Sequence, residues 1–260
     1  MIKRVNEIFL YRSMIGGLVI RDLRGRYKGS ILGFLWNFLN PMCQIIVYII
    51  VFSMIFRSGI EYYYIYLLVG MMPWNFFAEA VREGSGCIVY QADMLKKIYF
   101  PREVLVISAV TSRFVNFMIT YAVVFIIILV SGVGISFRAL LFLPFILICE
   151  YIFALGLTLL LSGIDVYFRD VEHIVGVLLM AWVWATPIMY AYEAIGNGLL
   201  RRLIAVNPMT WFISVYHNIL YDKVCPDITI LGICFLICII SLIVGESVFI
   251  HLEKNFAEEL

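Results

Sequence analysis

Six apolar runs, each long enough to cross a lipid bilayer, divide this 260-residue sequence. A hydrocarbon core about 30 Å thick is crossed by about 20 helical residues, because each residue advances an α-helix by about 1.5 Å. Lipid offers no water to backbone groups, so each run is expected to be helical. The predicted fold is therefore an all-α, polytopic membrane protein with six transmembrane helices. The runs cover residues 31–56, 62–81, 104–131, 139–163, 174–191 and 228–250.

Composition excludes a soluble enzyme. Hydrophobic residues make up 63% of the chain and charged residues 14%, whereas soluble domains have about 45–50% and about 25%. The net charge of +1 creates no overall field that would attract nucleic acid, so no nucleic acid is expected as a partner. Most of the six cysteines lie in apolar runs, where free cysteine packs as a small hydrophobic residue, so no disulfide framework is expected.

Lysine and arginine predict which side of the membrane each segment faces. Segments 1–30, 82–103, 164–173 and 251–260 hold thirteen basic residues, and the alternate loops hold five. Six spans place both termini on the same side, and basic residues accumulate in cytoplasmic segments, so both termini are predicted to be cytoplasmic.

Two segments outside the spans are expected to form short helices at the membrane surface, the first of them amphipathic. Residues 1–30 lack the apolar core and cleavage site of a signal peptide, and are expected to lie as helix in the headgroup plane. The external segment 192–227 contains two apolar pieces, 194–205 and 209–221, separated by Asn207-Pro208. Both pieces are too short to span, so we expect two re-entrant or interfacial helices, which could close an outer mouth. Residues 31–250 form the transmembrane domain, and residues 251–260 a cytoplasmic tail.

Two charged residues are expected near mid-depth in the membrane. Arg113 lies about ten residues inside the third span and Glu150 about eleven residues inside the fourth. Because an unpaired charge is costly there, we expect an Arg113–Glu150 pair between adjacent helices. A proton or substrate site is the alternative.

Aromatic and amide side chains in the first and fifth spans suit a wall that contacts sugars. Flat rings stack on the apolar faces of pyranoses, and amides bind hydroxyl groups. Packing between helices would use the same residues, so that interpretation stays open. The candidate channel-lining residues are Trp36, Asn37, Asn40, Gln44, Tyr48, Trp182, Trp184 and Tyr190.

Catalytic chemistry is not evident in the chain. The three histidines lie outside the spans, and no Gly-Lys pair is present to end a phosphate-binding loop. We therefore expect no catalytic, cofactor-binding or metal-binding residues, and ATP chemistry from a second polypeptide. A membrane-embedded glycosyltransferase is an alternative, with Asp165 and Asp170 as its weak metal candidates.

Several motifs together resemble one transporter family. They are RDLRGRYKGS at 21–30 with its continuation to Pro41, LKKIYFPREVL at 95–105, VYFRD at 166–170, TPIMY at 186–190, and Asn207-Pro208. In this order they resemble the ABC-2 type permeases that export cell-surface polysaccharides, such as the O-antigen and wall teichoic acid exporters. The resemblance runs along nearly the whole chain.

The resemblance implies a homodimer with two cytoplasmic ATP-binding subunits, which bind ATP and magnesium, in the cytoplasmic membrane of a bacterium. It also implies that residues 84–100 form a coupling helix seated in the ATPase, and that 194–221 supply gate helices. A solvated charged loop is the alternative for the coupling segment. The coupling candidates are Glu83, Ile88, Leu95, Lys96, Lys97, Tyr99, Phe100, Pro101 and Arg102.

Four basic residues cluster where the pyrophosphate headgroup of an undecaprenyl-linked glycan would arrive: Arg21, Arg24, Arg26 and Lys28. Attraction to anionic membrane lipids explains them equally well. The expected function is export of a lipid-linked glycan through a channel between two permease copies. An ABC-2 exporter of a lipid or small molecule, and a secondary transporter, are the alternatives.

Overall fold

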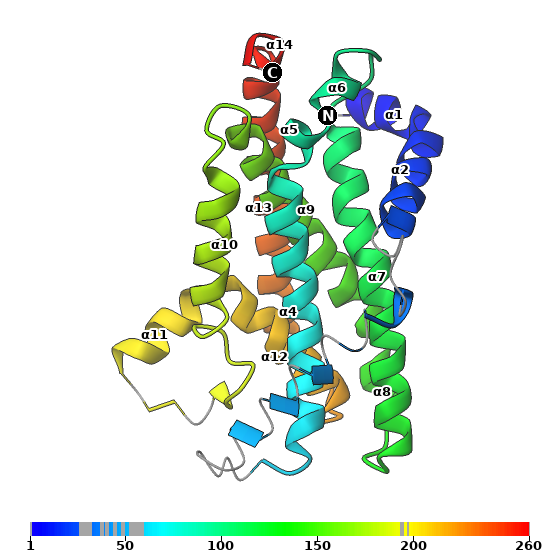
Figure 1. Cartoon of the computed structure of the whole chain (residues 1–260). Coiled ribbons are helices and arrows are strands. Elements are labelled where there is room, and N and C mark those ends of the chain that lie inside the picture. The colour runs from blue at the N-terminus through cyan, green and yellow to red at the C-terminus, as the bar shows by residue number, and fades with distance from the viewer. Residues whose placement is uncertain are drawn as a thin grey trace.

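The computed structural model describes residues 2–25, 33–36, 39, 42–43, 46–47, 50–51, 60–192, 195–196 and 198–259. Within these ranges the regular structure is helical and contains no strand, as predicted. The helices form an elongated bundle (Figure 1). Most of the predicted first span, 31–56, falls outside the described residues, which include the 3₁₀ turn η1 (Gly33–Leu35).

Three stretches of the described chain are helical, long and apolar enough to cross a membrane. They are α7 (Glu103–Val130), α8 (Phe137–Leu140) with α9 (Leu143–Asp165), and α13 (Ile228–Glu253). These helices coincide with the third, fourth and sixth apolar runs. Many of their large hydrophobic side chains are exposed on the surface of the chain, as a lipid environment permits.

Helix α4 (Tyr63–Ser85) lies at the centre of the bundle and packs against α7, α9, α10 and α12. Nearly every side chain from Ile65 to Phe77 is buried, so this chain alone already covers most of the surface of α4. The helix continues four residues past the predicted end of the second run at residue 81. This additional helical turn carries Glu83 and places its side chain inside the bundle.

Helix α10 (Val171–Trp182) is shorter than a membrane span. Its 12 residues fall short of the about 20 that a bilayer requires. The predicted fifth span, 174–191, is therefore an α-helix only as far as Trp182, and the chain then turns through Thr186-Pro187. Proline lacks an amide hydrogen and its ring clashes with the preceding helical turn, which explains the early end.

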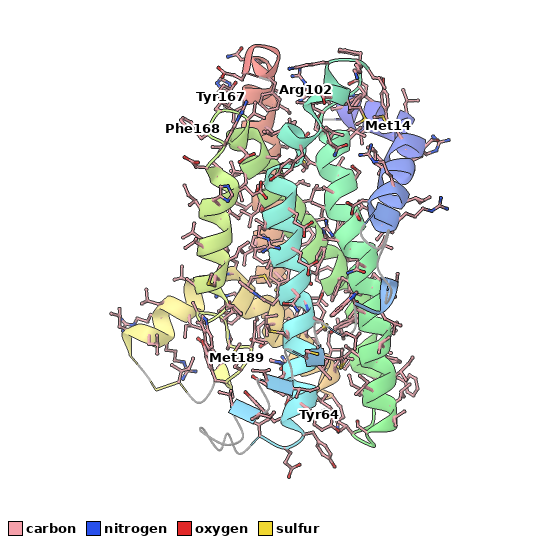
Figure 2. The ribbon with its side chains drawn as sticks, viewed as in Figure 1. Met14, Tyr64, Arg102, Tyr167, Phe168 and Met189 are labelled. Atoms are coloured by element: carbon pink, nitrogen blue, oxygen red, sulfur yellow. The ribbon has the colours of Figure 1, made fainter. Side chains whose placement is uncertain are left out.

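The short helices gather at the two ends of the bundle (Figure 1). One end holds α1 (Ile2–Leu10), α2 (Arg12–Gly25), α5 (Cys87–Tyr90), α6 (Ala92–Leu95) and α14 (Phe256–Glu259). We call it the terminal end; Met14, Arg102 and Tyr167 lie near it in Figure 2.

The opposite end, which we call the distal end, holds α11 (Leu199–Val206) and α12 (Pro208–Leu220). Asn207 caps α12: its side-chain oxygen accepts a hydrogen bond from the Met209 amide at 3.0 Å, and Pro208 occupies the first turn. Helix α12 is largely buried in the bundle, whereas α11 exposes leucines on its surface.

Two glycines let the backbones of α9 and α13 touch. A Cβ atom on Gly245 would overlap the carbonyl group of Gly156, and one on Gly156 would overlap the backbone of Ser241. The Ser241 hydroxyl also donates a hydrogen bond to the Phe153 carbonyl at 3.1 Å. Small residues at a helix crossing are typical of close contact between membrane helices, so these two helices form the tightest pair in the described bundle.

Candidate functional site

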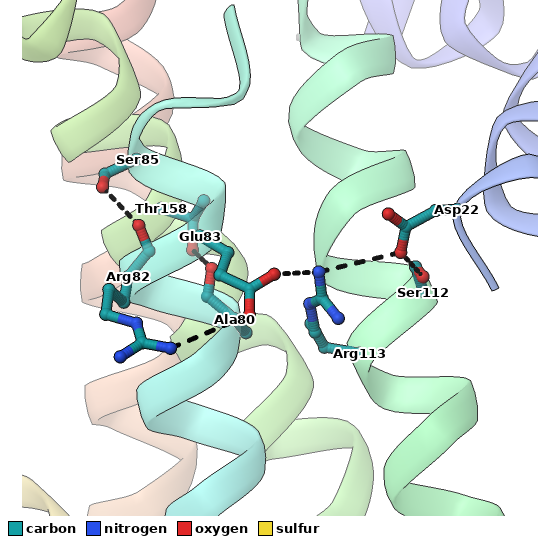
Figure 3. A network of polar contacts seen from close by, with 8 residues as sticks. All are labelled: Asp22, Ala80, Arg82, Glu83, Ser85, Ser112, Arg113 and Thr158. Carbon is teal, nitrogen blue, oxygen red and sulfur yellow. Dashed lines mark hydrogen bonds and ion pairs between the residues drawn. The ribbon is translucent and has the colours of Figure 1, made fainter. Parts of the chain in front are cut away.

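A buried arginine connects three helices near the terminal end (Figure 3). Arg113 on α7 donates a hydrogen bond to the Glu83 carboxylate on α4, and lies 3.7 Å from the Asp22 carboxylate on α2. The Ser112 hydroxyl also donates to Asp22. The Arg113 side chain is only 9% exposed. Because a buried guanidinium requires compensating charge, both carboxylates are held against it. We call these four residues the Arg113 cluster.

The predicted pairing of Arg113 with Glu150 is wrong. Arg113 lies ten residues from the terminal-end start of α7, or about 15 Å, whereas Glu150 lies fifteen residues from the terminal-end limit of α9, or about 22 Å. The two side chains are therefore at different depths. The extra turn of α4 places Glu83 beside Arg113 instead.

Glu150 has its own partner on the distal side of the bundle. Its Oε2 atom accepts a hydrogen bond of 2.5 Å from the Tyr216 hydroxyl on α12, and both side chains are fully buried. The contact joins α9 to α12. Sequence reasoning identified Glu150 as a residue that needs a partner, but Tyr216 carries no charge and gave no signal.

The predicted coupling helix over 84–100 is not one helix. It contains the last two residues of α4, then two four-residue helices, α5 and α6, separated at Gln91, and residues 96–100 are not helical. At Gly86 the chain passes close to its neighbours: a Cβ atom there would lie 2.6 Å from the Glu172 carboxylate and 2.7 Å from the Tyr90 ring. A side chain at position 86 would therefore clash, and the segment bends where a continuous helix was expected.

The candidate coupling residues divide between surface and interior. Lys96, Lys97 and Tyr99 are exposed, and Tyr99 is 96% exposed. Leu95, Pro101 and Arg102 are half-buried. Ile88 and Phe100 are buried in a hydrophobic cluster between α2, α7 and α13, so they are unable to contact a docked protein directly. Glu83 belongs to the Arg113 cluster. The exposed tip of the segment is thus residues 96–99.

Two hydrogen bonds attach the segment to helices on either side. Arg21 on α2 donates to the Gln91 side chain at 2.7 Å, and the Tyr90 hydroxyl donates to the Glu172 carboxylate on α10 at 2.6 Å. The bond to Glu172 raises the pKa of Tyr90, which keeps the phenol protonated. Sequence reasoning missed Tyr90, Gln91 and Glu172, because partners 70 and 82 residues apart leave no local pattern.

A second charged group lies at the tip of the terminal end. Arg4 on α1 lies 3.3 Å from the Glu103 carboxylate and donates to Glu253 on α13. Arg102 donates to the backbone carbonyl of Glu253 and covers the Phe256 ring at 5.4 Å. A cavity of about 600 Å³ opens here between α1, the 95–102 segment and the end of α13. The first helix is thus bound to the last of the long helices.

The structure describes two of the four residues that are predicted to bind a lipid headgroup. Arg21 bonds to Gln91, and Arg24 is exposed at the end of α2. Arg26 and Lys28 lie outside the described residues. Their common role stays a prediction.

The candidate channel-lining residues differ in their surroundings: some form contacts within the chain, and others are exposed. The Trp182 indole donates to Asn207 at 2.8 Å and packs edge-on against Trp74, so it acts in contacts between helices. Tyr190 donates to the Trp184 carbonyl at 3.0 Å. Trp36 and Trp184 expose their rings, at 44% and 57%. Asn37, Asn40, Gln44 and Tyr48 lie outside the described residues.

The aspartates weighed as metal ligands have other surroundings. Asp165 accepts a hydrogen bond from the Glu172 backbone amide at 3.2 Å near the start of α10, and Asp170 is exposed. In the part of the chain that the structure describes, no three His, Cys, Asp or Glu side chains are grouped to hold a metal ion.

Comparison with known proteins identifies the family. The model of the ABC-2 type transporter family matches residues 15–221, which include most of α2, the coupling segment and α12. The chain is 34% identical over 261 residues, the whole of both chains, to the O-antigen export system permease protein RfbA of Myxococcus xanthus. It is 30% identical over 240 residues, 92% of both chains, to the O-antigen export system permease protein RfbA of Klebsiella pneumoniae. The chain therefore belongs to the ABC-2 type transporter family.

Proposed function

We propose that the chain is the permease subunit of an ATP-driven exporter that moves a lipid-linked cell-surface polysaccharide across the cytoplasmic membrane. The observation that carries this proposal is the similarity to O-antigen export permeases over the full length of the chain. The all-helical bundle with helices of membrane-spanning length agrees with it. In the proposed exporter the terminal end faces the cytoplasm and the distal end faces outward, the orientation that the distribution of basic residues predicts.

A separate ATP-binding subunit supplies the energy. It docks on the exposed tip at residues 96–99, where two lysines and Tyr99 offer a basic and aromatic contact surface. The sequence has no Gly-Lys pair, so ATP and magnesium bind to that partner.

Movement of the docked ATPase reaches the membrane helices through the contacts already described. The tip pulls on α2 through Gln91 and Arg21, and on α10 through Tyr90 and Glu172. The Arg113 cluster passes movement of α2 to α4 and α7. Two copies of the permease form the channel around a two-fold axis, with the exposed Trp36 and Trp184 rings as candidate walls and α11 with α12 at its outer mouth.

The decisive experiment combines a gene deletion with co-purification. Deletion of the gene from its host should leave the lipid-linked polysaccharide in the cytoplasm and remove it from the surface, and the intact gene should restore export. The purified permease should bring down an ATPase whose hydrolysis rate changes when the host's lipid-linked glycan is added. Normal surface polysaccharide in the deletion strain would reject polysaccharide export. Stimulation of the ATPase by a phospholipid or drug alone would favour the small-molecule alternative.

A further inference from the structure

A second cavity, of about 400 Å³, lies at the distal end between the start of α4, the chain around Pro187–Tyr192 and the end of α12. Its volume is within the range of about 300–1,000 Å³ typical of small-molecule sites. None of the residues considered above as channel wall or coupling surface lines it.

Aromatic rings make one side of the cavity. Tyr66 stacks on His217 with ring centroids 3.8 Å apart, and Tyr221 meets Tyr66 edge-on at 5.2 Å. Hydrogen bonds hold all three rings: Tyr66 donates to the Tyr190 carbonyl, His217 contacts the Tyr66 carbonyl at 3.0 Å, and Tyr221 donates to the Glu61 carbonyl at 2.7 Å. The rings are therefore fixed before any ligand arrives, which lowers the entropic cost of binding.

Polar groups with unused bonding capacity face the same cavity. Asn218 and Glu61 both line it, and within the described part of the chain neither side chain forms a hydrogen bond or an ion pair. An amide offers both donors and acceptors, and a carboxylate forms strong bonds with hydroxyl donors. Tyr192, whose ring is held between Trp211 and Arg201, lines another part of the wall.

We propose that this cavity is a pyranose-binding subsite at the external mouth of the transporter, which holds one or two sugar units of the polysaccharide as it leaves. The inference rests on the proposed function. A sugar ring places its C–H face on Tyr221 or Tyr192 and its hydroxyl groups on Asn218 and Glu61. With few bonds per sugar unit the polymer leaves easily, as conduction through a chain of sites requires. A weak site here opposes backward sliding between ATP-driven steps.

Photocrosslinking during export tests the position of the subsite. Ala191 lines the cavity with only a methyl group, so a diazirine amino acid at this position samples its contents. The matched control places the same amino acid at Leu236, which is 59% exposed on α13. After illumination of exporting cells, position 191 should give a high-molecular-mass adduct that glycan-cleaving treatment removes, and position 236 should not. Adducts absent at 191, or equal at both positions, would overturn the proposal.

Substitutions test whether the named groups act on the sugar. Tyr221→Ala and Asn218→Ala should each lower the export rate by about fivefold, the effect expected for loss of one stacking or hydrogen-bonding contact. They should leave the membrane level and ATPase binding unchanged. Phe145→Ala, which shortens a half-exposed ring outside the cavity, is the control. Export at the control rate in both variants would overturn the subsite. This result differs from failure of the proposed function, in which the gene deletion itself leaves surface polysaccharide unchanged.

Discussion

The two ends of this molecule are connected by different kinds of contact. At the terminal end, charged side chains join separate elements: Arg113 joins α2, α4 and α7, and Arg4 joins α1 to α7 and α13. At the distal end, mostly uncharged groups and stacked rings connect the elements, as in Trp182 with Asn207 and Tyr66 with His217. The Arg4 side chain is partly open to water, where ion pairs exchange partners at little cost, whereas the buried Arg113 cluster and the buried amide and aromatic contacts are costly to break. The comparison indicates that α1, at the tip of the terminal end, is suited to movement and that the distal end is suited to a fixed shape.

Arg113→Ala should have the largest effect on stability. Removal of one member of a buried charge cluster costs about 3–5 kcal/mol, and the partly exposed carboxylates of Glu83 and Asp22 place the expected value near the lower limit. Unfolding of the purified protein in bicelles measures it. Arg113→Lys, which keeps the charge, is the control and should lose less than half as much. Equal losses in both variants would show that geometry rather than charge holds these helices.

Asn207→Ala should destabilise the distal end by about 2 kcal/mol. The side chain caps α12 and also bonds to Trp182, Thr186 and the Ala185 carbonyl, so several groups lose partners together. Hydrogen exchange should show faster opening confined to α12 and the 183–190 turn. Asn218→Ala, which removes an amide near the other end of α12, is the matched control and should leave exchange unchanged. Opening that spreads to α2 would contradict a distal end that holds its shape separately.

Tyr90→Phe should change stability by less than about 1 kcal/mol, because the lost bond to Glu172 is near the surface. The export rate should fall by a larger factor than the equilibrium constant of folding. If this bond carries movement from the docked ATPase to α10, ATP hydrolysis continues while export falls. Tyr62→Phe, at an exposed ring of the distal end whose hydroxyl has no described hydrogen bond, is the matched control. Parallel loss of hydrolysis and export would place Tyr90 in docking instead.

Lys97→Glu should leave the unfolding free energy unchanged, because the side chain is exposed. Co-purification of the ATPase should nevertheless fall, since charge reversal at a contact rim opposes association. Lys223→Glu, which alters a lysine at the distal end, is the control and should retain the partner. Retention in both variants would move the docking surface away from residues 96–99.

The sequence predicted the class of fold because it follows from the length of the apolar runs alone. Depth within the membrane was harder to predict. A shift of four residues at the end of α4 moved Glu83 into the bundle and gave Arg113 a partner other than Glu150. The exposed tip at residues 96–99 could be predicted because its charged residues are neighbours in the sequence. The hydrogen bonds of Arg21 and Tyr90 could not, because they join residues far apart in the sequence. Such contacts depend on tertiary arrangement, which periodicity and charge counts do not contain.

The glycine crossing of α9 and α13 has a mechanical consequence. The backbones touch at Gly156 and Gly245, and the same two helices also meet through Phe145 with Phe235 and through Gly163 with Phe249, so they are bound together along most of their length. We therefore expect α9 and α13 to move as one rigid unit in any conformational change. Relative movement would then occur between this pair and the helices packed around it, α4, α7 and α12.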